Sequence, residues 1–208
     1  VKNISDNTVR PELSKSFSAL SIQNKENVQS TFLLQVKDSN GNWVNATSSN
    51  ILDYESSPSA SVTCDASKVE VTLKDFSAEN NLSSSFDGII AKKIDENTST
   101  LYEYRWIETN VSVNGVSANY DTAKWQDNGK GLVYSGEVIV KDNQTSSVLG
   151  DSTTQTSGAN DTTAIFTSSA DDSGNFTNQL SGEVQIEARK LWKDENGNNI
   201  AGDERVKD

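Results

Sequence analysis

"STFLLQVKDSNGNW" (residues 30–43) places apolar side chains at every second position and then turns through an Asn-Gly pair. Phe32, Leu34 and Val36 share one face of an extended strand, because successive side chains in a strand point to opposite faces. An Asn-Gly pair at the end of such a segment is typical of a β-hairpin. The same alternation recurs in three further segments: KVEVTL (68–73), LYEYRW (101–106) and GEVIVKD (136–142).

The rest of the chain agrees with an all-β fold. It has only two prolines in 208 residues, and no segment shows a convincing amphipathic helix pattern. Residues 144–161 are nearly all Ser, Thr, Gly, Asn and Asp, which predicts a long polar loop. We therefore predict one antiparallel β-sandwich, with the first strand lying beside the last.

Composition excludes several classes of function. The net charge is −12, from 30 acids and 18 bases, and such a surface repels a nucleic acid backbone. The chain has no His, no Met and one cysteine, Cys64, which excludes His-based catalytic triads, most zinc sites and an internal disulfide. No apolar run is long enough to span a bilayer, and we expect no signal peptide. We expect no metal and no cofactor, and we expect Cys64 to fill a strand position.

The two edges of the sequence resemble each other. VKNISDNTVRPELSKSF (1–17) aligns without a gap on FTNQLSGEVQIEARKLW (176–192), at a constant offset of 175 (178 − 3 and 190 − 15). The alignment pairs Asn3 with Asn178, Val9 with Val184, Glu12 with Glu187, Lys15 with Lys190, and Phe17 with Trp192. Similar edges predict a tandem array of modules that this sequence cuts near its junctions.

This periodicity predicts how the chain is divided. Residues 1–9 are expected to end a preceding module or linker, residues 10–182 to form the β-sandwich, and residues 183–208 to be a linker and the first strand of a following module. Asn3 and Lys190 would then serve these neighbouring modules.

Three polar residues occupy positions where the alternation calls for hydrophobes. Lys15 shares a phase with Leu13 and Phe17, Glu108 continues the phase of LYEYRW, and Asn178 lies in phase with its apolar neighbours in NFTNQL (175–180). Burial of an unpaired ammonium or carboxylate costs several kcal/mol. A bulge or an edge strand would put any one of them in water, but that explanation is weak for all three together.

Their chemistry offers an explanation. A desolvated lysine loses its proton and becomes a nucleophile, and a desolvated glutamate gains one and donates a hydrogen bond to a carbonyl. An asparagine amide between them can be attacked at its carbonyl carbon, with loss of ammonia. The product is an intramolecular isopeptide bond. No turnover follows, so the chain would not be an enzyme in the ordinary sense.

At this point the sequence resembles a known family, the Cna B-type, Ig-like domains of Gram-positive surface proteins and pili. YEYRWIETNVSVNG (102–115) is similar to the family's segment in which a glutamate follows alternating tyrosines, and SKSF (14–17) and RKLWKDENGNN (189–199) are similar to its first strand. NFTNQL (175–180) is similar to its last strand, which carries the bond-forming asparagine.

The resemblance implies that Lys15 is the nucleophile, Glu108 the proton shuttle and Asn178 the electrophile. It also implies a stalk or spacer module of a wall-anchored, extracellular surface protein, adhesin or pilus, whose partners are its neighbouring domains. One departure concerns length, because Glu108 and Asn178 lie 70 residues apart (178 − 108), which exceeds the family's usual spacing. Residues 117–175 are therefore expected to be a large insertion before the last strand, made of strands.

The insertion leaves an alternative open. A ligand-binding adhesin module could use residues 117–175 to bind a host extracellular ligand, with Trp125 and Tyr134 as exposed anchors. We favour the interpretation that these aromatics form a second small core beneath the insertion. DENGNNIAGDER (194–205) lacks the glycine and glutamate of a calcium loop at its sixth and twelfth places, so we interpret it as an acidic hairpin turn.

Overall fold

The structure is a computed structural model and describes residues 7–18, 28–76, 82–113, 115–142 and 161–180. Apart from two short 3-10 turns, η2 (Ser48–Asn50) and η3 (Thr122–Lys124), its regular elements are all strands. The strands are β1 (Thr8–Val9), β2 (Leu13–Ser18), β3 (Val28–Lys37), β4 (Trp43–Asn45), β5 (Ile51–Tyr54), β6 (Ala60–Cys64), β7 (Val69–Leu73), β8 (Ser83–Phe86), β9 (Ile89–Lys92), β10 (Tyr104–Val113), β11 (Val116–Asn119), β12 (Trp125–Asp127), β13 (Gly131–Tyr134), β14 (Val138–Asp142), β15 (Asp161–Asp171) and β16 (Asn175–Leu180). The described part contains no helix long and apolar enough to cross a membrane.

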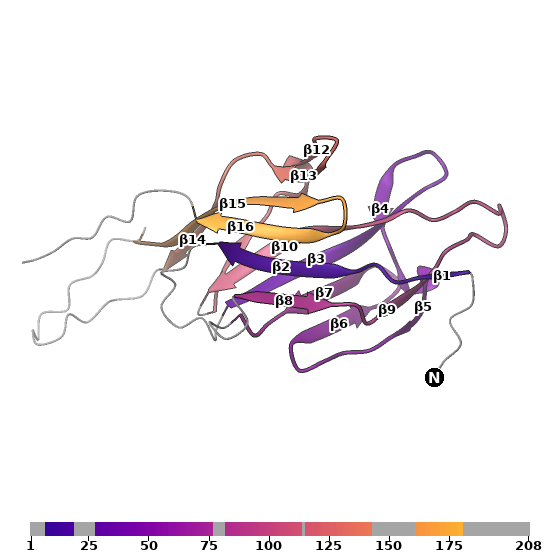
Figure 1. Cartoon of the computed structure of the whole chain (residues 1–208), viewed down its shortest axis with the longest axis horizontal. Coiled ribbons are helices and arrows are strands. Elements are labelled where there is room, and N and C mark those ends of the chain that lie inside the picture. The colour runs from indigo at the N-terminus through magenta and orange to yellow at the C-terminus, as the bar shows by residue number, and fades with distance from the viewer. Residues whose placement is uncertain (1–6, 19–27, 77–81, 114, 143–160, 181–208) are drawn as a thin grey trace, which may run out of the picture.

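Two large sheets pack face to face as a sandwich, which confirms the predicted fold class (Figure 1). One sheet has the order β11-β10-β3-β7-β6, with β4 also paired to β3. The other has the order β12-β13-β15-β16-β2-β8, with β14 also paired to β15. A third, three-stranded sheet has the order β1-β9-β5. Thr8 and Val9, in the segment that we expected to belong to a preceding module, form β1 and pair with Lys92 and Ala91.

The alternating segment from which the fold was predicted forms β3 and the turn after it. Phe32, Leu34 and Val36 are buried, and β3 pairs antiparallel with both β10 and β7. The turn is closed by Asp38, whose side chain accepts hydrogen bonds from two backbone amides that follow it. Gly41 takes a positive φ of 83°, which side-chain-bearing residues rarely adopt.

The first long strand lies beside the last one, as the sequence predicts, but the two run parallel. In β2 and β16 the partners are Lys15 with Phe176 and Phe17 with Asn178, and Figure 1 shows the two strands as adjacent arrows pointing the same way. This parallel pair is an exception in a sandwich whose other strand pairings are antiparallel in the described residues. Parallel neighbours need a long connection, and here most of the module provides it.

In the part of residues 117–175 that the structure describes, the expected insertion adds strands and the short 3-10 turn η3. Of its residues, β12 to β15 extend the sheet that contains β16, and β13 and β14 both pair with β15. Trp125 and Tyr134 are each 7% exposed, so they are core residues and not surface anchors. They pack against Tyr120 and belong to the same hydrophobic cluster as the rest of the sandwich, not to a separate second core.

Several predicted features fall outside the described residues. Asn3, Lys190, the segment 183–208 and its acidic turn at 194–205 are among them. Cys64 ends β6, pairs with Val69 and packs partly buried against the core, so it occupies the strand position that we expected.

Candidate crosslinking site

Lys15 and Glu108 form an ion pair across the interior of the sandwich. Lys15 Nζ lies 2.8 Å from Glu108 Oε1 and donates a hydrogen bond to Oε2 at 3.0 Å. Both side chains are 0% exposed. The pair joins the two large sheets, because Lys15 belongs to β2 and Glu108 to β10.

Strand periodicity explains the position of the lysine. Leu13, Lys15 and Phe17 all point into the core, whereas Ser14 and Ser16 between them are partly exposed. The Lys15 ammonium lies 5.0 Å from the centre of the Phe17 ring. A cation that is held against an aromatic ring and one carboxylate has exchanged its water shell for these two neighbours.

A β-bulge in β10 sets the position of the glutamate. Trp106 and Glu108 are buried, and the register to β3 then shifts between Glu108 and Asn110. After the shift the buried phase moves to Val111 and Val113. Bulges of this kind redirect side chains and are frequent beside functional sites.

Asn178 lies on the same inner face as Lys15, on the neighbouring strand. It is 0% exposed. Because β16 pairs Phe176 with Lys15 and Asn178 with Phe17, Asn178 and Lys15 are diagonal neighbours on adjacent strands. The three residues that the sequence singled out therefore face one buried volume.

Tyr120, which the sequence analysis did not single out, contacts the amide of Asn178. Its hydroxyl oxygen lies 3.2 Å from Asn178 Nδ2 and 3.4 Å from Asn178 Oδ1. The same hydroxyl lies 2.7 Å from Ser168 Oγ, and the charge of Glu108 helps to raise its pKa. Tyr120 follows β11, and its alternation with Val116 and Ala118 was the available signal of its burial.

Trp125 binds the backbone of the glutamate. Its indole nitrogen donates a hydrogen bond of 2.9 Å to the backbone carbonyl of Glu108. Its ring stacks on Tyr120 and meets Phe176 edge to face. Tyr120 and Trp125 both come from residues 117–175, so the segment that looked like an insertion encloses the polar centre.

Burial changes the acid–base properties of this centre. It lowers the pKa of Lys15 to about 8, against the opposing attraction of Glu108. Burial, followed by the charge of Glu108, raises the pKa of the Tyr120 phenol well above its ordinary value. The centre thus combines a lysine that releases its proton easily with a tyrosine that stays neutral and able to donate a hydrogen bond.

Aromatic rings surround these polar groups. Phe17 packs against Phe76 and Phe166 at centroid distances of 5.0 and 5.5 Å, and Phe32 packs against Phe176 at 5.0 Å. These rings keep water away from the polar groups, and electrostatic interactions among the enclosed groups are stronger than in solvent. An amine, an amide and a carboxyl group enclosed in this way can react with one another.

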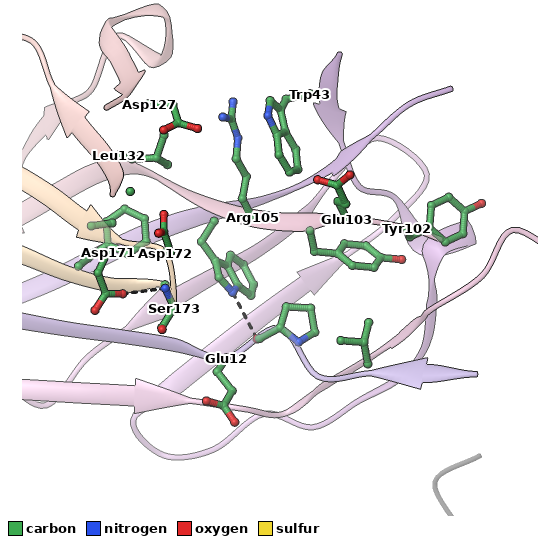
Figure 2. A pocket seen from close by; sticks show the side chains of 18 residues that line it. Glu12, Trp43, Tyr102, Glu103, Arg105, Asp127, Leu132, Asp171, Asp172 and Ser173 are labelled. Carbon is green, nitrogen blue, oxygen red and sulfur yellow. Dashed lines mark hydrogen bonds between the residues drawn. The ribbon is translucent and has the colours of Figure 1, made fainter. Parts of the chain in front are cut away.

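A separate cleft of about 450 Å³ opens near the start of β2 (Figure 2). Figure 2 shows Arg105 between Trp43 and Asp127. The Arg105 guanidinium lies 4.3 Å from the centre of the Trp43 ring. Many polar groups of the cleft bond to the protein itself. Asp171 accepts hydrogen bonds from the backbone amides of Ser173 and Asn175, and Arg105 donates to Gln35. The ligand-binding alternative stays a prediction.

Comparison of the chain with family models, with curated proteins and with solved structures gives no match.

Proposed function

We propose that the chain is a structural module that crosslinks itself through an isopeptide bond between Lys15 and Asn178, with Glu108 as the proton shuttle. The observation that carries this proposal is the fully buried Lys15–Glu108 ion pair, which shares an enclosed core with the buried amide of Asn178. The Cna B-type resemblance of the sequence supports the same assignment.

Stability alone gives a poor reason for this ion pair. Two charges taken out of water lose hydration worth several kcal/mol each, and well-packed hydrophobic residues in their place are often equally or more stable. The alternation of β2 and β10 would accept apolar side chains at both positions. A reaction that consumes the lysine charge accounts for polar groups at these places.

The proposed reaction balances without any other reactant. Lys15 Nζ passes a proton to Glu108 and attacks Asn178 Cγ, and the protonated acid donates a hydrogen bond to the carbonyl oxygen as negative charge develops there. The new Nζ–Cγ bond forms and the Cγ–Nδ2 bond breaks. The lysine nitrogen gives up two protons, of which one leaves on the departing nitrogen as ammonia and the other stays on Glu108.

Such a bond suits a stalk or spacer of a bacterial surface protein or pilus. It would close 163 residues (178 − 15), for which the chain-entropy estimate is about 5 kcal/mol. It would also join the first and last strands of the sandwich directly. We propose accordingly that the partners of this module are its neighbours in the same chain, on the extracellular side of a Gram-positive cell wall.

The intact mass of the purified chain tests the proposal. A crosslinked chain weighs one ammonia less than its sequence, and Lys15→Ala should weigh what its own sequence requires. Loss of the bond and of the buried pair should lower the melting temperature of this variant by roughly 10–20 °C, at 2–4 °C for each kcal/mol. A wild-type mass equal to that of the sequence would contradict the covalent bond.

A second variant tests the role of the acid separately from that of the amine and the amide that form the bond. Glu108→Ala keeps the amine and the amide but removes the proton shuttle, so it should retain the full sequence mass. Loss of ammonia also accompanies an ester between a threonine and a glutamine. Treatment with hydroxylamine distinguishes the two products, because it cleaves the ester and leaves the isopeptide bond intact.

A further inference from the structure

Tyr120 occupies the gap between the acid and the leaving group of the proposed reaction. Its hydroxyl oxygen is 3.2 Å from Asn178 Nδ2, the atom that must depart as ammonia. Glu108 already contacts Lys15 with both carboxylate oxygens, at 2.8 and 3.0 Å. The acid is thus placed on the side of the nucleophile, and the tyrosine stands next to the leaving nitrogen.

The Tyr120 hydroxyl acts as both donor and acceptor toward the polar groups around it. Asn178 Nδ2 has hydrogens to donate and no lone pair to accept with, so it donates to the tyrosine oxygen. Ser168 Oγ lies 2.7 Å from the same oxygen, and either hydroxyl can be the donor in this contact. The hydroxyl of Tyr120 donates to Asn178 Oδ1, at 3.4 Å, and the nearby charge of Glu108 helps to raise the pKa of the phenol. The tyrosine hydroxyl thus contacts both polar atoms of the amide and lies within reach of the charge of the acid.

We propose that Tyr120 is a fourth catalytic residue, which holds the Asn178 amide in its reactive orientation and relays a proton from Glu108 to the departing nitrogen. This inference rests on the proposed function. Tyr120 Oη lies within 3.4 Å of both polar atoms of the amide, so it restrains rotation of the amide about the Cβ–Cγ bond.

The relay conserves protons at each step. Lys15 first gives a proton to Glu108. When the Cγ–Nδ2 bond breaks, Tyr120 gives its hydroxyl proton to Nδ2 and takes the proton that Glu108 carries, while the second proton of the attacking nitrogen passes to Glu108. The products are the isopeptide bond and ammonia, with the tyrosine restored. The proton left on Glu108 is released with the ammonia as ammonium.

Tyr134 provides a matched control in the same aromatic cluster. The two rings meet edge to face with centroids 4.9 Å apart, and both residues are buried, at 6 and 7% exposure. The Tyr134 hydroxyl, however, accepts a hydrogen bond from the backbone amide of Asp121, at 3.2 Å. Replacement of each tyrosine by phenylalanine removes one buried hydroxyl and keeps the ring.

The experiment follows bond formation during refolding. The full chain is purified unfolded in urea from inclusion bodies and diluted into buffer, and samples quenched in acid are weighed to follow the loss of ammonia. Tyr120→Phe should form the bond at least about tenfold more slowly than the wild type, since a positioned acid–base group contributes tenfold or more. Tyr134→Phe should react within about threefold of the wild-type rate. Equal rates for Tyr120→Phe and the wild type would overturn the inference.

Two further measurements separate chemistry from folding. In a Lys15→Ala background no bond can form, so the melting temperatures of that variant with and without Tyr120→Phe report the structural effect of the hydroxyl alone. The pH profile of the rate is the second measurement. The rate of bond formation should fall at high pH when Lys15, whose pKa is about 8, loses its proton. Tyr120→Phe should lower the rate at every pH without changing the pH at which this fall occurs. A decline moved toward the ordinary pKa of lysine would mean that the core had opened, and would overturn the relay.

The outcomes distinguish the two proposals. A wild-type chain that refolds and keeps its full mass contradicts the crosslink itself. A wild-type chain that loses ammonia while Tyr120→Phe does so equally fast contradicts only the role of the tyrosine. If Tyr120→Phe does not fold, Ser168→Ala serves instead, because it removes a hydrogen bond that fixes the hydroxyl and should slow the reaction by a smaller factor; an unchanged rate there would count against the relay.

Discussion

At the scale of single residues, the central feature is a lysine that has lost its water. Burial lowers its pKa to about 8 even though Glu108 opposes the shift. Transfer of one proton within the pair changes the ion pair into a neutral amine and a neutral acid without any exchange with solvent. The reactive form therefore has the same number of protons as the resting form.

This proton count predicts how the rate of bond formation depends on pH. Between neutrality and about pH 8, the number of protons on the Lys15–Glu108 pair does not change, so the rate of bond formation should be constant. Above that pH, Lys15 loses its proton to solvent, so no proton is left to pass to Glu108 and nothing polarises the carbonyl, and the rate should fall. Quenched refolding at several pH values, with mass detection, measures this. A rate that kept rising up to about pH 10, near the ordinary pKa of lysine, would show that the amine alone limits the reaction.

The same lysine predicts a pH dependence of stability in a chain that cannot crosslink. In Asn178→Ala, Lys15 should have a pKa of about 8 when folded and near its ordinary value of 10.5 when unfolded. Between these values the unfolded state binds more protons, so the free energy of unfolding should rise with pH, by at most about 1.4 kcal/mol per pH unit. Urea unfolding at several pH values across this window measures it. Lys15→Met in the same background is the control and should lack this contribution.

The sequence identified three members of the centre because each breaks an alternation. Lys15, Glu108 and Asn178 are polar where hydrophobes belong, and such a conflict is visible without a structure. Tyr120 breaks no rule, because a buried tyrosine is an ordinary core residue. Its contact with Asn178 depends on how two sheets pack, and no spacing in the sequence contains that information.

At the scale of elements, the turn between β15 and β16 sets the register on which Asn178 depends. Gly174 has a positive φ of 81°, and its carbonyl accepts a hydrogen bond of 3.2 Å from the amide of Ser14, in β2. A Cβ atom on Gly174 would lie 2.8 Å from the carbonyl oxygen of Glu12. The last strand can therefore approach the first only because this residue has no side chain.

Replacement of this glycine should disturb the site from a distance. Gly174→Ala forces a side-chain-bearing residue into a left-handed backbone, at a cost of about 1–2 kcal/mol, and must in addition push β2 away from β16, which moves Asn178 relative to Lys15. We expect slower bond formation and a lower melting temperature. Gly129→Ala is the control, with a φ of 79° but no heavy atom within 4 Å of the added carbon. Equal effects of the two substitutions on the rate of bond formation would contradict this role of the turn.

The sequence predicted the existence of most of these strands but not how they pair. Alternation identified β3, β7, β10 and β14, because each has several apolar residues on one face. The parallel pairing of β2 with β16 joins segments from the two ends of the module, and its direction depends on the number and path of the strands between them. The bulge at Glu108 depends likewise on its partner strand, β3.

At the scale of the whole molecule, the parallel terminal strands determine how the module would bear load. The chain enters β2 at one end of the strand pair and leaves β16 at the other (Figure 1). Tension on the two ends therefore shears these strands against each other. A bond between Lys15 and Asn178 would carry that tension from one strand to the next and bypass all the strands between them.

Single-molecule stretching should show this bypass directly. With the bond in place, residues 15–178 cannot extend, whereas Lys15→Ala should release these 163 residues (178 − 15), a length of about 550 Å at 3.3–3.6 Å per residue. Handles attached beyond both strands apply the force. Full extension of the wild-type chain at the force that unfolds the variant would contradict a load-bearing crosslink.

The most direct test of the central claim is fragmentation mass spectrometry of the digested wild-type protein. We predict one branched peptide that joins the segment around Lys15 to the segment around Asn178, lighter by one ammonia than the two segments together, with fragment ions that locate the branch at these two side chains. Separate linear peptides that contain unmodified Lys15 and unmodified Asn178, with no branched species, would contradict the account.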